Sequence, residues 1–231
     1  MSTTPLNRIQ ALPLYAIERV DKPGQDREYI TPEGILNSVT SILSGTRDNS
    51  GIDNWRESVG ATRADLIRDL ACWRGNRHDE NITEYLLTGK EPKFNFFYSP
   101  YWTSTRTFVR SINQTLLTQA PIWHPDGFAG TADWLGYLSA TDDSATLIDW
   151  KTADRDLKPY KLYEYSLQLA AYRAALHHVY KPQGLRIRQA VIAAAYPNRT
   201  PLIETFTEDA LDQLFLHFQG RLQRYIYAKR T

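Results

Sequence analysis

The 231-residue sequence contains one cysteine, Cys72, and almost no net charge. A single cysteine excludes an internal disulfide, a multi-cysteine zinc site and a cysteine-ligated iron–sulfur cluster. The 27 Lys and Arg residues nearly balance the 26 Asp and Glu residues. This balance excludes a polybasic, tail-like binder, so any contact with nucleic acid must come from a local patch.

The chain also lacks segments that would place it at a membrane or couple it to ATP. No apolar run approaches the roughly 18 residues that span a bilayer, and the N-terminus lacks the pattern of a secretory signal. No GxxxxGK[ST] phosphate loop is present. We therefore expect a cytoplasmic protein without membrane contact, encoded by a bacterium or a phage.

Helical spacing dominates the first half of the sequence, and strand-like alternation begins in the middle. Ser38 or Thr40 is predicted to cap a short helix. Helices are predicted over 38–43, 53–73, 75–87, 99–117, 160–180 and 208–229, and strands over 121–123, 127–138, 145–152, 187–196 and 201–206. The order predicts an α/β (α+β) fold, with an N-terminal helical lobe over 1–118 and a core over 119–231 in one integrated domain.

The strongest chemical signal is Asp149-Trp150-Lys151 in the strand predicted over 145–152. Side chains alternate along a strand, so Asp149 and Lys151 share one face and Trp150 points to the other. A carboxylate can hold a hard cation, and an ammonium can stabilise a charged nucleophile or phosphate. Taken alone, the pattern is more often an incidental surface ion pair.

The preceding strand carries a second carboxylate, Asp133, in Gly130-Thr131-Ala132-Asp133. A hairpin turn at 141–144 places Asp133 beside Asp149 on the neighbouring strand. Two adjacent carboxylates repel each other unless a cation or a proton lies between them. The pair therefore indicates a divalent-metal site.

Two weaker signals lie on predicted helices. Gln168 and Tyr172 are four residues apart and share a helix face that can lie beside the Asp149 strand. His78 falls on the apolar stripe of its helix and is a candidate metal ligand. The alternatives are a half-buried packing pair for Gln168 and Tyr172, and a hydrogen-bonded core histidine for His78.

Together these motifs resemble the PD-(D/E)xK nuclease superfamily, in particular its RecB-like exonuclease branch with the mitochondrial genome-maintenance exonuclease and its phage relatives. The resemblance matches Gly75-x-x-His78, Gly130-x-x-Asp133, Asp149-x-Lys151 and Gln168-x-x-x-Tyr172, and Ser38-Val39-Thr40 is similar to an N-terminal signature of the mitochondrial enzyme. It implies a central mixed β-sheet flanked by helices. Many relatives have a glutamate before the Gly-x-x-Asp strand, where this chain has Gln119.

The resemblance implies a metal-dependent deoxyribonuclease that uses one or two Mg²⁺ or Mn²⁺ ions, without ATP or an iron–sulfur cluster. His78, Asp133, Asp149 and the Trp150 carbonyl would bind metal, while Lys151, Gln168 and Tyr172 would complete the catalytic set. The implied activity is exonucleolytic cleavage of single-stranded DNA ends in repair, recombination or replication. A catalytically inactive DNA-binding module and a structure- or sequence-specific endonuclease remain as alternatives.

Residues outside these motifs are candidates for contacting DNA. The segment 93–102 is rich in aromatic residues and precedes Arg106, a combination suited to stacking unpaired bases. An aromatic core cluster under the helical lobe is an equally good interpretation. The predicted substrate-binding residues are Ser38, Thr40, Arg74, Phe97, Trp102 and Arg106.

Overall fold

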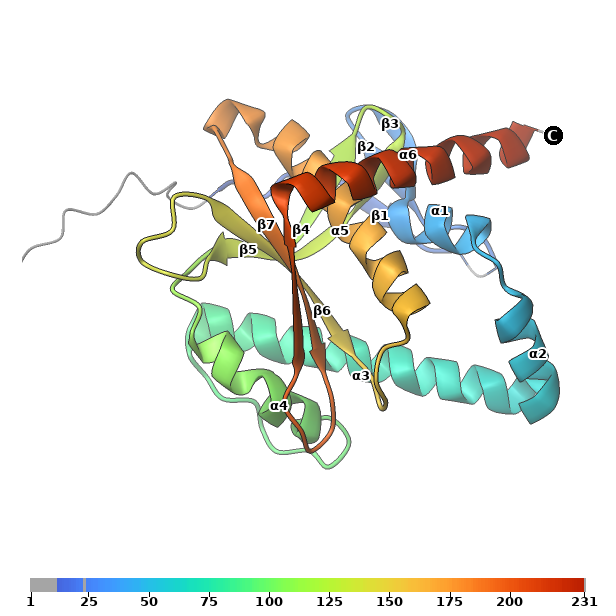
Figure 1. Ribbon diagram of the computed structural model, residues 1–231, viewed down its shortest axis with the longest axis horizontal. Coiled ribbons are helices and arrows are strands. Elements are labelled where there is room, and N and C mark those ends of the chain that lie inside the picture. The colour runs from blue at the N-terminus through green and yellow to red at the C-terminus, as the bar shows by residue number, and fades with distance from the viewer. Residues whose placement is uncertain (1–11, 23, 231) are drawn as a thin grey trace, which may run out of the picture.

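The computed structural model describes residues 12–22 and 24–230, which form one mixed sheet with helices on both faces (Figure 1). The strands are β1 (Glu18–Val20), β2 (Glu28–Thr31), β3 (Gly34–Ser38), β4 (Gln114–His124), β5 (Phe128–Tyr137), β6 (Ala145–Thr152), β7 (Ile187–Ala195) and β8 (Leu202–Thr207). The helices are α1 (Val39–Thr46), α2 (Ser50–Val59), α3 (Ala61–Thr88), α4 (Ser99–Arg110), α5 (Pro159–Val179) and α6 (Glu208–Arg230), and a short 3-10 turn, η1, covers Lys181–Gln183.

The strand order is β1-β2-β3-β5-β6-β7-β8, with β4 paired to β5. The pairs β3–β5 and β6–β7 are parallel and the others are antiparallel, so the sheet is mixed, as predicted. Strand β4 pairs with β5 from Phe128 to Tyr137. The opposite edge of β5 is therefore shared, by β3 at Phe128 and Ala129 and by β6 from Trp134 to Gly136.

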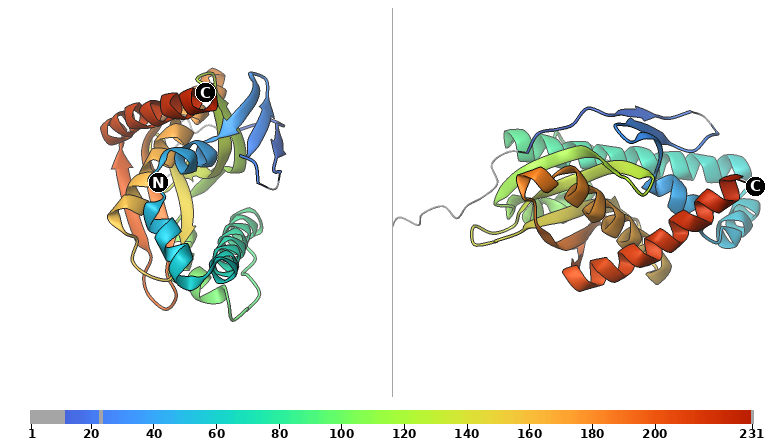
Figure 2. Two further views of the ribbon diagram at one scale, coloured as in Figure 1. Left: turned by 90° about the vertical axis from the view of Figure 1, so that its right-hand side faces the viewer. Right: turned by 90° about the horizontal axis from the view of Figure 1, so that it is seen from above.

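Helices cover the two faces of the sheet unequally (Figures 1 and 2). Helices α1, α5 and α6 pack on one face around the larger apolar core, whose buried members include Leu169, Phe128 and Phe218. Helices α3 and α4 pack on the other face around a smaller core that includes Ile148 and Trp150. Because Ile148 and Trp150 point into the smaller core, Asp149 between them is directed toward α5.

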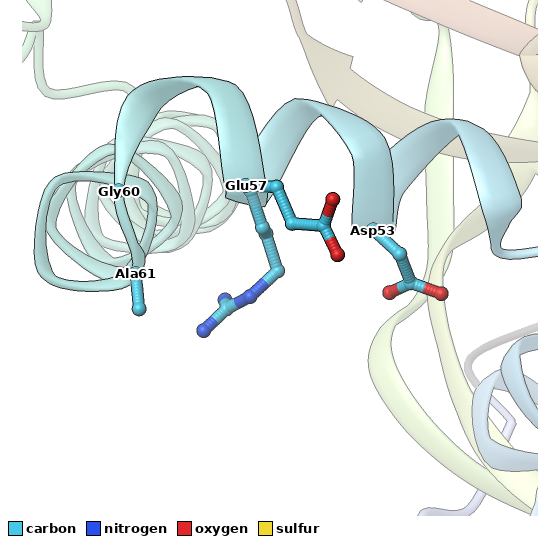
Figure 3. Close-up of a pocket in the computed structure, with 5 residues that line it drawn as sticks. Asp53, Glu57, Gly60 and Ala61 are labelled. Carbon is cyan, nitrogen blue, oxygen red and sulfur yellow. The ribbon is translucent and has the colours of Figure 1, made fainter.

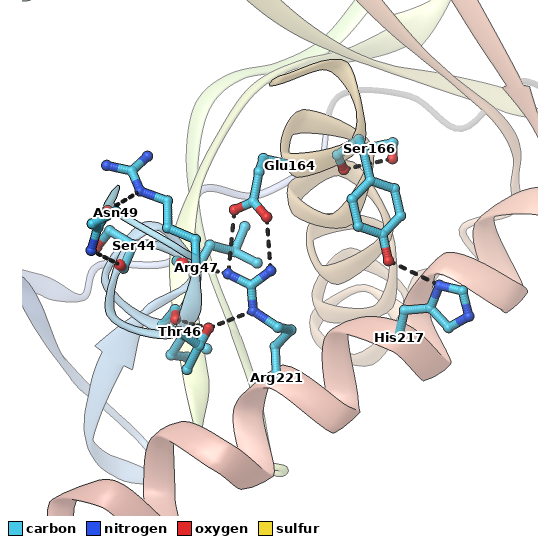
Figure 4. Close-up of polar contacts among 11 residues, drawn as sticks. Ser44, Thr46, Arg47, Asn49, Glu164, Ser166, His217 and Arg221 are labelled. Atoms are coloured by element: carbon cyan, nitrogen blue, oxygen red, sulfur yellow. Dashed lines mark hydrogen bonds and ion pairs between the residues drawn. The ribbon is translucent and has the colours of Figure 1, made fainter. Parts of the chain in front are cut away.

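Arg221 of α6 forms hydrogen bonds to both α1 and α5 (Figure 4). Its guanidinium donates to Thr46 Oγ1 at 2.6 Å, to the Leu43 carbonyl at 2.5 Å and to Glu164 Oε1 at 2.7 Å. The Arg221 side chain is 9% exposed. A buried guanidinium whose three nitrogens all donate hydrogen bonds fixes the positions of the elements that supply its acceptors.

The break between α2 and α3 lies at Gly60, whose positive φ of 84° allows the chain to turn. A surface cavity of about 410 Å³ lies at this elbow, lined by Asp53, Arg56, Glu57, Gly60 and Ala61 (Figure 3). The predicted break near residue 74 is wrong, because Gly75 lies inside the continuous helix α3. No residue predicted for the functional site lines this cavity.

Several other predictions are confirmed, and three are wrong. Ser38 is the α1 N-cap, accepting from Ser41 N at 2.9 Å, and the elements predicted over 160–180, 187–196, 201–206 and 208–229 are present. The expectation of helices alone before residue 118 missed β1, β2 and β3. The helix predicted over 99–117 ends at Arg110, and β4 begins at Gln114, seven residues before the strand predicted at 121.

None of the helices within 12–22 and 24–230 carries an apolar stretch of the length that a bilayer crossing requires.

Candidate active site

Asp133 and Asp149 meet at the point where β5 and β6 separate. The ladder between these strands ends at the pair Trp134 and Ile148, so the next pair in register is Asp133 and Asp149. The predicted register of this hairpin is therefore confirmed. Beyond it, β5 turns to pair with β3 while β6 continues along β7, and the two carboxylates occupy the opening between the strands.

The Asp133 carboxylate bridges the opening. Its Oδ2 accepts the backbone N–H of Trp150 at 3.0 Å, and its Oδ1 lies 3.5 Å from the Gln119 side-chain amide nitrogen. Burial, and then the charge of Asp149, raise the pKa of Asp133 to about 7. The folded protein therefore holds Asp133 beside a like charge at a cost that a cation would remove.

Asp149 is 1% exposed, and each of its oxygens faces a different partner. Gln168 Nε2 donates to Oδ1 at 3.0 Å, and the Lys151 ammonium lies 2.5 Å from Oδ2. Apart from this ion pair, the buried Oδ2 has no hydrogen-bond partner among the described residues. Burial raises the pKa of Asp149, whereas the Lys151 charge opposes that rise.

Lys151 remains an ammonium because its surroundings are anionic. Burial would lower the pKa of Lys151, but the charges of Asp149 and Asp133 outweigh burial and raise it. The Lys151 side chain as a whole is 18% exposed.

Gly130 and Tyr172 explain why two of the motifs occur together. A Cβ at Gly130 would lie 2.4 Å from Tyr172 Cε1, so only glycine lets the buried Tyr172 ring lie against β5. Burial raises the pKa of the Tyr172 hydroxyl. Tyr172 therefore packs α5 onto the strand that carries Asp133, and Gln168, one turn earlier, reaches Asp149.

Asp79 of α3 interacts electrostatically with both aspartates, and the sequence interpretation missed it. Burial, and then the charge of Asp133, raise the pKa of Asp79 well above its usual value, and Lys151 and Asp149 also act on it. Gly75, four residues earlier on the same face, approaches the end of β6, since a Cβ there would lie 3.8 Å from Thr152 Oγ1. The four-residue spacing from Gly75, which puts Asp79 on the same helix face, is the sequence signal that could have identified Asp79.

His78 lies in the interface between α3 and α4. It is fully buried, its Nε2 is 3.5 Å from Thr105 Oγ1, and its Nδ1 has no hydrogen-bond partner among the described residues. Burial lowers the pKa of His78 to about 3, so the ring is neutral. No hydrogen bond or ion pair joins the His78 ring to Asp133 or Asp149, and its predicted role as a metal ligand stays a prediction.

Gln119 lies opposite Asp133 in β4 and has a φ of 47°. A left-handed backbone is uncommon for a residue other than glycine and costs about 1–2 kcal/mol. The strain occurs where the side-chain amide approaches the Asp133 carboxylate.

The predicted substrate-binding residues fall into two groups. Phe97 is 68% exposed, and Thr40 and Arg106 are also exposed. Trp102 is 5% exposed, packs against Tyr85 and donates from Nε1 to Glu91. Its predicted stacking on bases is therefore wrong for this conformation, because the ring belongs to the core between α3 and α4.

Ser38 and Arg74 are also engaged within the fold. Ser38 is 2% exposed and caps α1. Arg74 stacks on Tyr101, with its guanidinium carbon 4.7 Å from the ring centroid, and pairs with Asp154 at 3.0 Å.

The donor atoms suit a divalent cation, although no complete cluster is preformed. Carboxylate oxygens are the ligands that Mg²⁺ prefers, and Mn²⁺ also accepts them. Asp149 Oδ2 is a buried oxygen held by the Lys151 ion pair alone, and its neighbour Asp133 is destabilised by burial and like charge. Within the described parts of the chain, no three His, Cys, Asp or Glu side chains lie close enough to hold an ion as they stand.

Comparison with known proteins identifies one family. Residues 55–229 match the sequence profile of the PD-(D/E)XK nuclease superfamily. No curated protein matches the sequence. A Eubacterium rectale protein provisionally assigned as an exonuclease superposes with a TM-score of 0.47 and 17% identity over 70% of this chain and 68% of its own. The protein SSO0001 superposes with a TM-score of 0.26 and 18% identity over 42% of this chain and 41% of its own.

Proposed function

The chain belongs to the PD-(D/E)XK nuclease superfamily, and from its site we propose that it is a Mg²⁺- or Mn²⁺-dependent deoxyribonuclease that degrades single-stranded DNA from free ends. Superfamily membership supports hydrolysis of nucleic acid, and members generally use divalent metals. The RecB-like branch, with the mitochondrial genome-maintenance exonuclease and phage enzymes, is the branch we propose. A role in DNA repair, recombination or replication follows from that branch.

One observation carries the proposal: Asp133, Asp149 and Lys151 converge where β5 and β6 separate. The three groups come from two strands, and their proximity does not stabilise the fold. Burial and then repulsion by Asp149 raise the pKa of Asp133, which means that the charged form of Asp133 is destabilised. Buried like charges are retained where chemistry uses them.

Asp133 and Asp149 would hold the cation, with the Trp150 carbonyl next to Asp149 in sequence and the Asp79 carboxyl interacting electrostatically with both aspartates. When bound, a divalent cation lowers the pKa of a coordinated water and polarises the scissile phosphate. The protein fixes both carboxylates in advance. Trp150 N–H holds Asp133 Oδ2, and Gln168 holds Asp149 Oδ1.

Lys151 would bind the phosphate oxygens and stabilise the charge that develops in the pentavalent transition state. Its ammonium is permanently charged at neutral pH because Asp149 and Asp133 raise its pKa in spite of burial. Gln168 orients the carboxylate that holds the ammonium, and Tyr172 keeps α5 against β5. These two residues therefore act through the groups they hold.

The DNA strand would contact the exposed members of the predicted substrate-binding set. Phe97 offers an aromatic face for an unpaired base, and Thr40 and Arg106 offer a hydroxyl and a cation for the backbone.

Cleavage of end-labelled linear and circular single-stranded DNA tests the proposal, in Mg²⁺, Mn²⁺ or EDTA. We expect cleavage of linear DNA only, none in EDTA, and a loss of about 100-fold or more in Asp149→Asn or Lys151→Met. Asp143→Asn, at an exposed aspartate between β5 and β6, is the matched control and should retain full activity. Cleavage of circles would indicate an endonuclease, and binding without any cleavage would indicate an inactive module.

A further inference from the structure

The Lys151 ammonium has two partners of different kinds. It pairs with Asp149 Oδ2 at 2.5 Å and lies 4.9 Å from the centroid of the Tyr165 ring. Tyr165 is on α5, three residues before Gln168, so both side chains project from the same face of the helix toward the site. The sequence interpretation did not include Tyr165.

A cation at the site would compete with Lys151 for Asp149. Gln168 already occupies Asp149 Oδ1, so Oδ2 is the oxygen left for a metal, and Oδ2 is the oxygen that faces the ammonium. An ammonium that loses its carboxylate in a largely buried position needs another stabilising group. The face of an aromatic ring supplies such a group, because its quadrupole attracts a cation.

We propose that Tyr165 is a positioning residue that retains the Lys151 ammonium at the site when Asp149 Oδ2 turns to a divalent cation. The inference rests on the proposed metal-dependent nuclease function. The ring acts rather than the hydroxyl, because the ammonium lies over the ring face. Lys151 would then lose the ion pair, keep the cation–π contact and retain its charge for the phosphate.

Two variants separate the ring from the hydroxyl: Tyr165→Phe retains the ring, and Tyr165→Leu removes it. We expect Tyr165→Phe to keep kcat within about twofold, and Tyr165→Leu to lower kcat about tenfold with KM and Mn²⁺ affinity little changed. Full activity of Tyr165→Leu would overturn the proposal. An equal loss in Tyr165→Phe would also overturn it, because the hydroxyl would then be the acting group.

A measurement without substrate tests the geometry independently of cleavage. In NMR spectra, the Lys151 ε-methylene protons, assigned by their absence in Lys151→Met, should show an upfield ring-current shift that persists when Mg²⁺ is added. The shift should be absent in Tyr165→Leu and retained in Tyr165→Phe. Its disappearance with Mg²⁺ would refute retention of the ammonium by the ring. If the wild type cleaves no DNA but the shift persists, the nuclease proposal fails while the lysine–tyrosine contact stands.

Discussion

Replacing Asp133 by asparagine should stabilise the metal-free protein, although it removes a proposed metal ligand. Burial, and then the charge of Asp149, raise the pKa of Asp133 from 3.8 to about 7. Three pKa units correspond to about 4 kcal/mol at most, and we expect about 2 kcal/mol because Asp133 is only partly buried and solvent screens it. The asparagine side chain keeps an oxygen that can accept the Trp150 N–H.

The sign follows from proton linkage. A carboxyl whose pKa is raised by folding binds its proton more tightly in the folded state, so stability falls as pH rises from about 4 to about 7. The Asp133→Asn variant lacks this loss. Its advantage should therefore be full at pH 8 and vanish near pH 4.

Thermal unfolding in EDTA across pH 4 to 8 measures the effect. For a chain of this size, about 2 kcal/mol corresponds to a Tm increase of roughly 4–8 °C at pH 8. Millimolar Mn²⁺ should then raise the Tm of the wild type and leave the variant nearly unchanged, because only the wild type retains both carboxylates. Asp143→Asn, at an exposed position, should match the wild type. A variant less stable than the wild type at pH 8, or an advantage independent of pH, would refute the electrostatic argument.

Three further experiments test the packing of individual side chains. Gly130→Ala should cost about 1–3 kcal/mol through collision with Tyr172, and Tyr172→Leu should recover part of that loss in a double-mutant cycle of urea unfolding; strictly additive losses would contradict the collision. Gln119→Gly should raise the unfolding free energy by up to about 1 kcal/mol, because glycine tolerates the φ of 47°; a clear decrease would show that the side chain contributes more than the strain costs. Trp102→Ala should cost about 3–5 kcal/mol and Phe97→Ala less than about 1 kcal/mol, given their exposures of 5% and 68%; equal losses would contradict this difference in burial.

The local part of the site was predictable because it depends on strand alternation and hairpin register. The placement of Asp149 and Lys151 on one face requires only that 145–152 is a strand. The pairing of Asp133 with Asp149 requires only the turn position, and the ladder ending at Trp134 and Ile148 has that register. Both arguments use periodicity within about 20 residues of sequence.

The remaining features depend on contacts that periodicity does not contain. Asp79 and His78 are adjacent, and which of them faces the aspartates is set by how α3 packs on β6. Phe97 and Trp102 belong to one aromatic segment, yet tertiary packing buries one and exposes the other. The positive φ of Gln119 has no sequence signal, since glycine and asparagine are the residues usually associated with that conformation.

Strands β1, β2 and β3 were missed for a related reason. They are three to five residues long, too short for alternation to emerge, and β3 joins the sheet through only two pairs with β5. Short strands of this kind are stabilised by the partner rather than by their own propensity.

The Arg221 contacts make assembly of the candidate active site dependent on a distant helix. Arg221 and Thr46 are 175 positions apart in sequence, and Glu164, on the helix that carries Gln168, is joined to the same guanidinium. During synthesis, Asp133, Asp149 and Lys151 leave the ribosome well before the residue that secures α5 over them. Contacts of such long separation form slowly, so we expect the nascent polypeptide to acquire its hydrolytic competence only after α6 has docked.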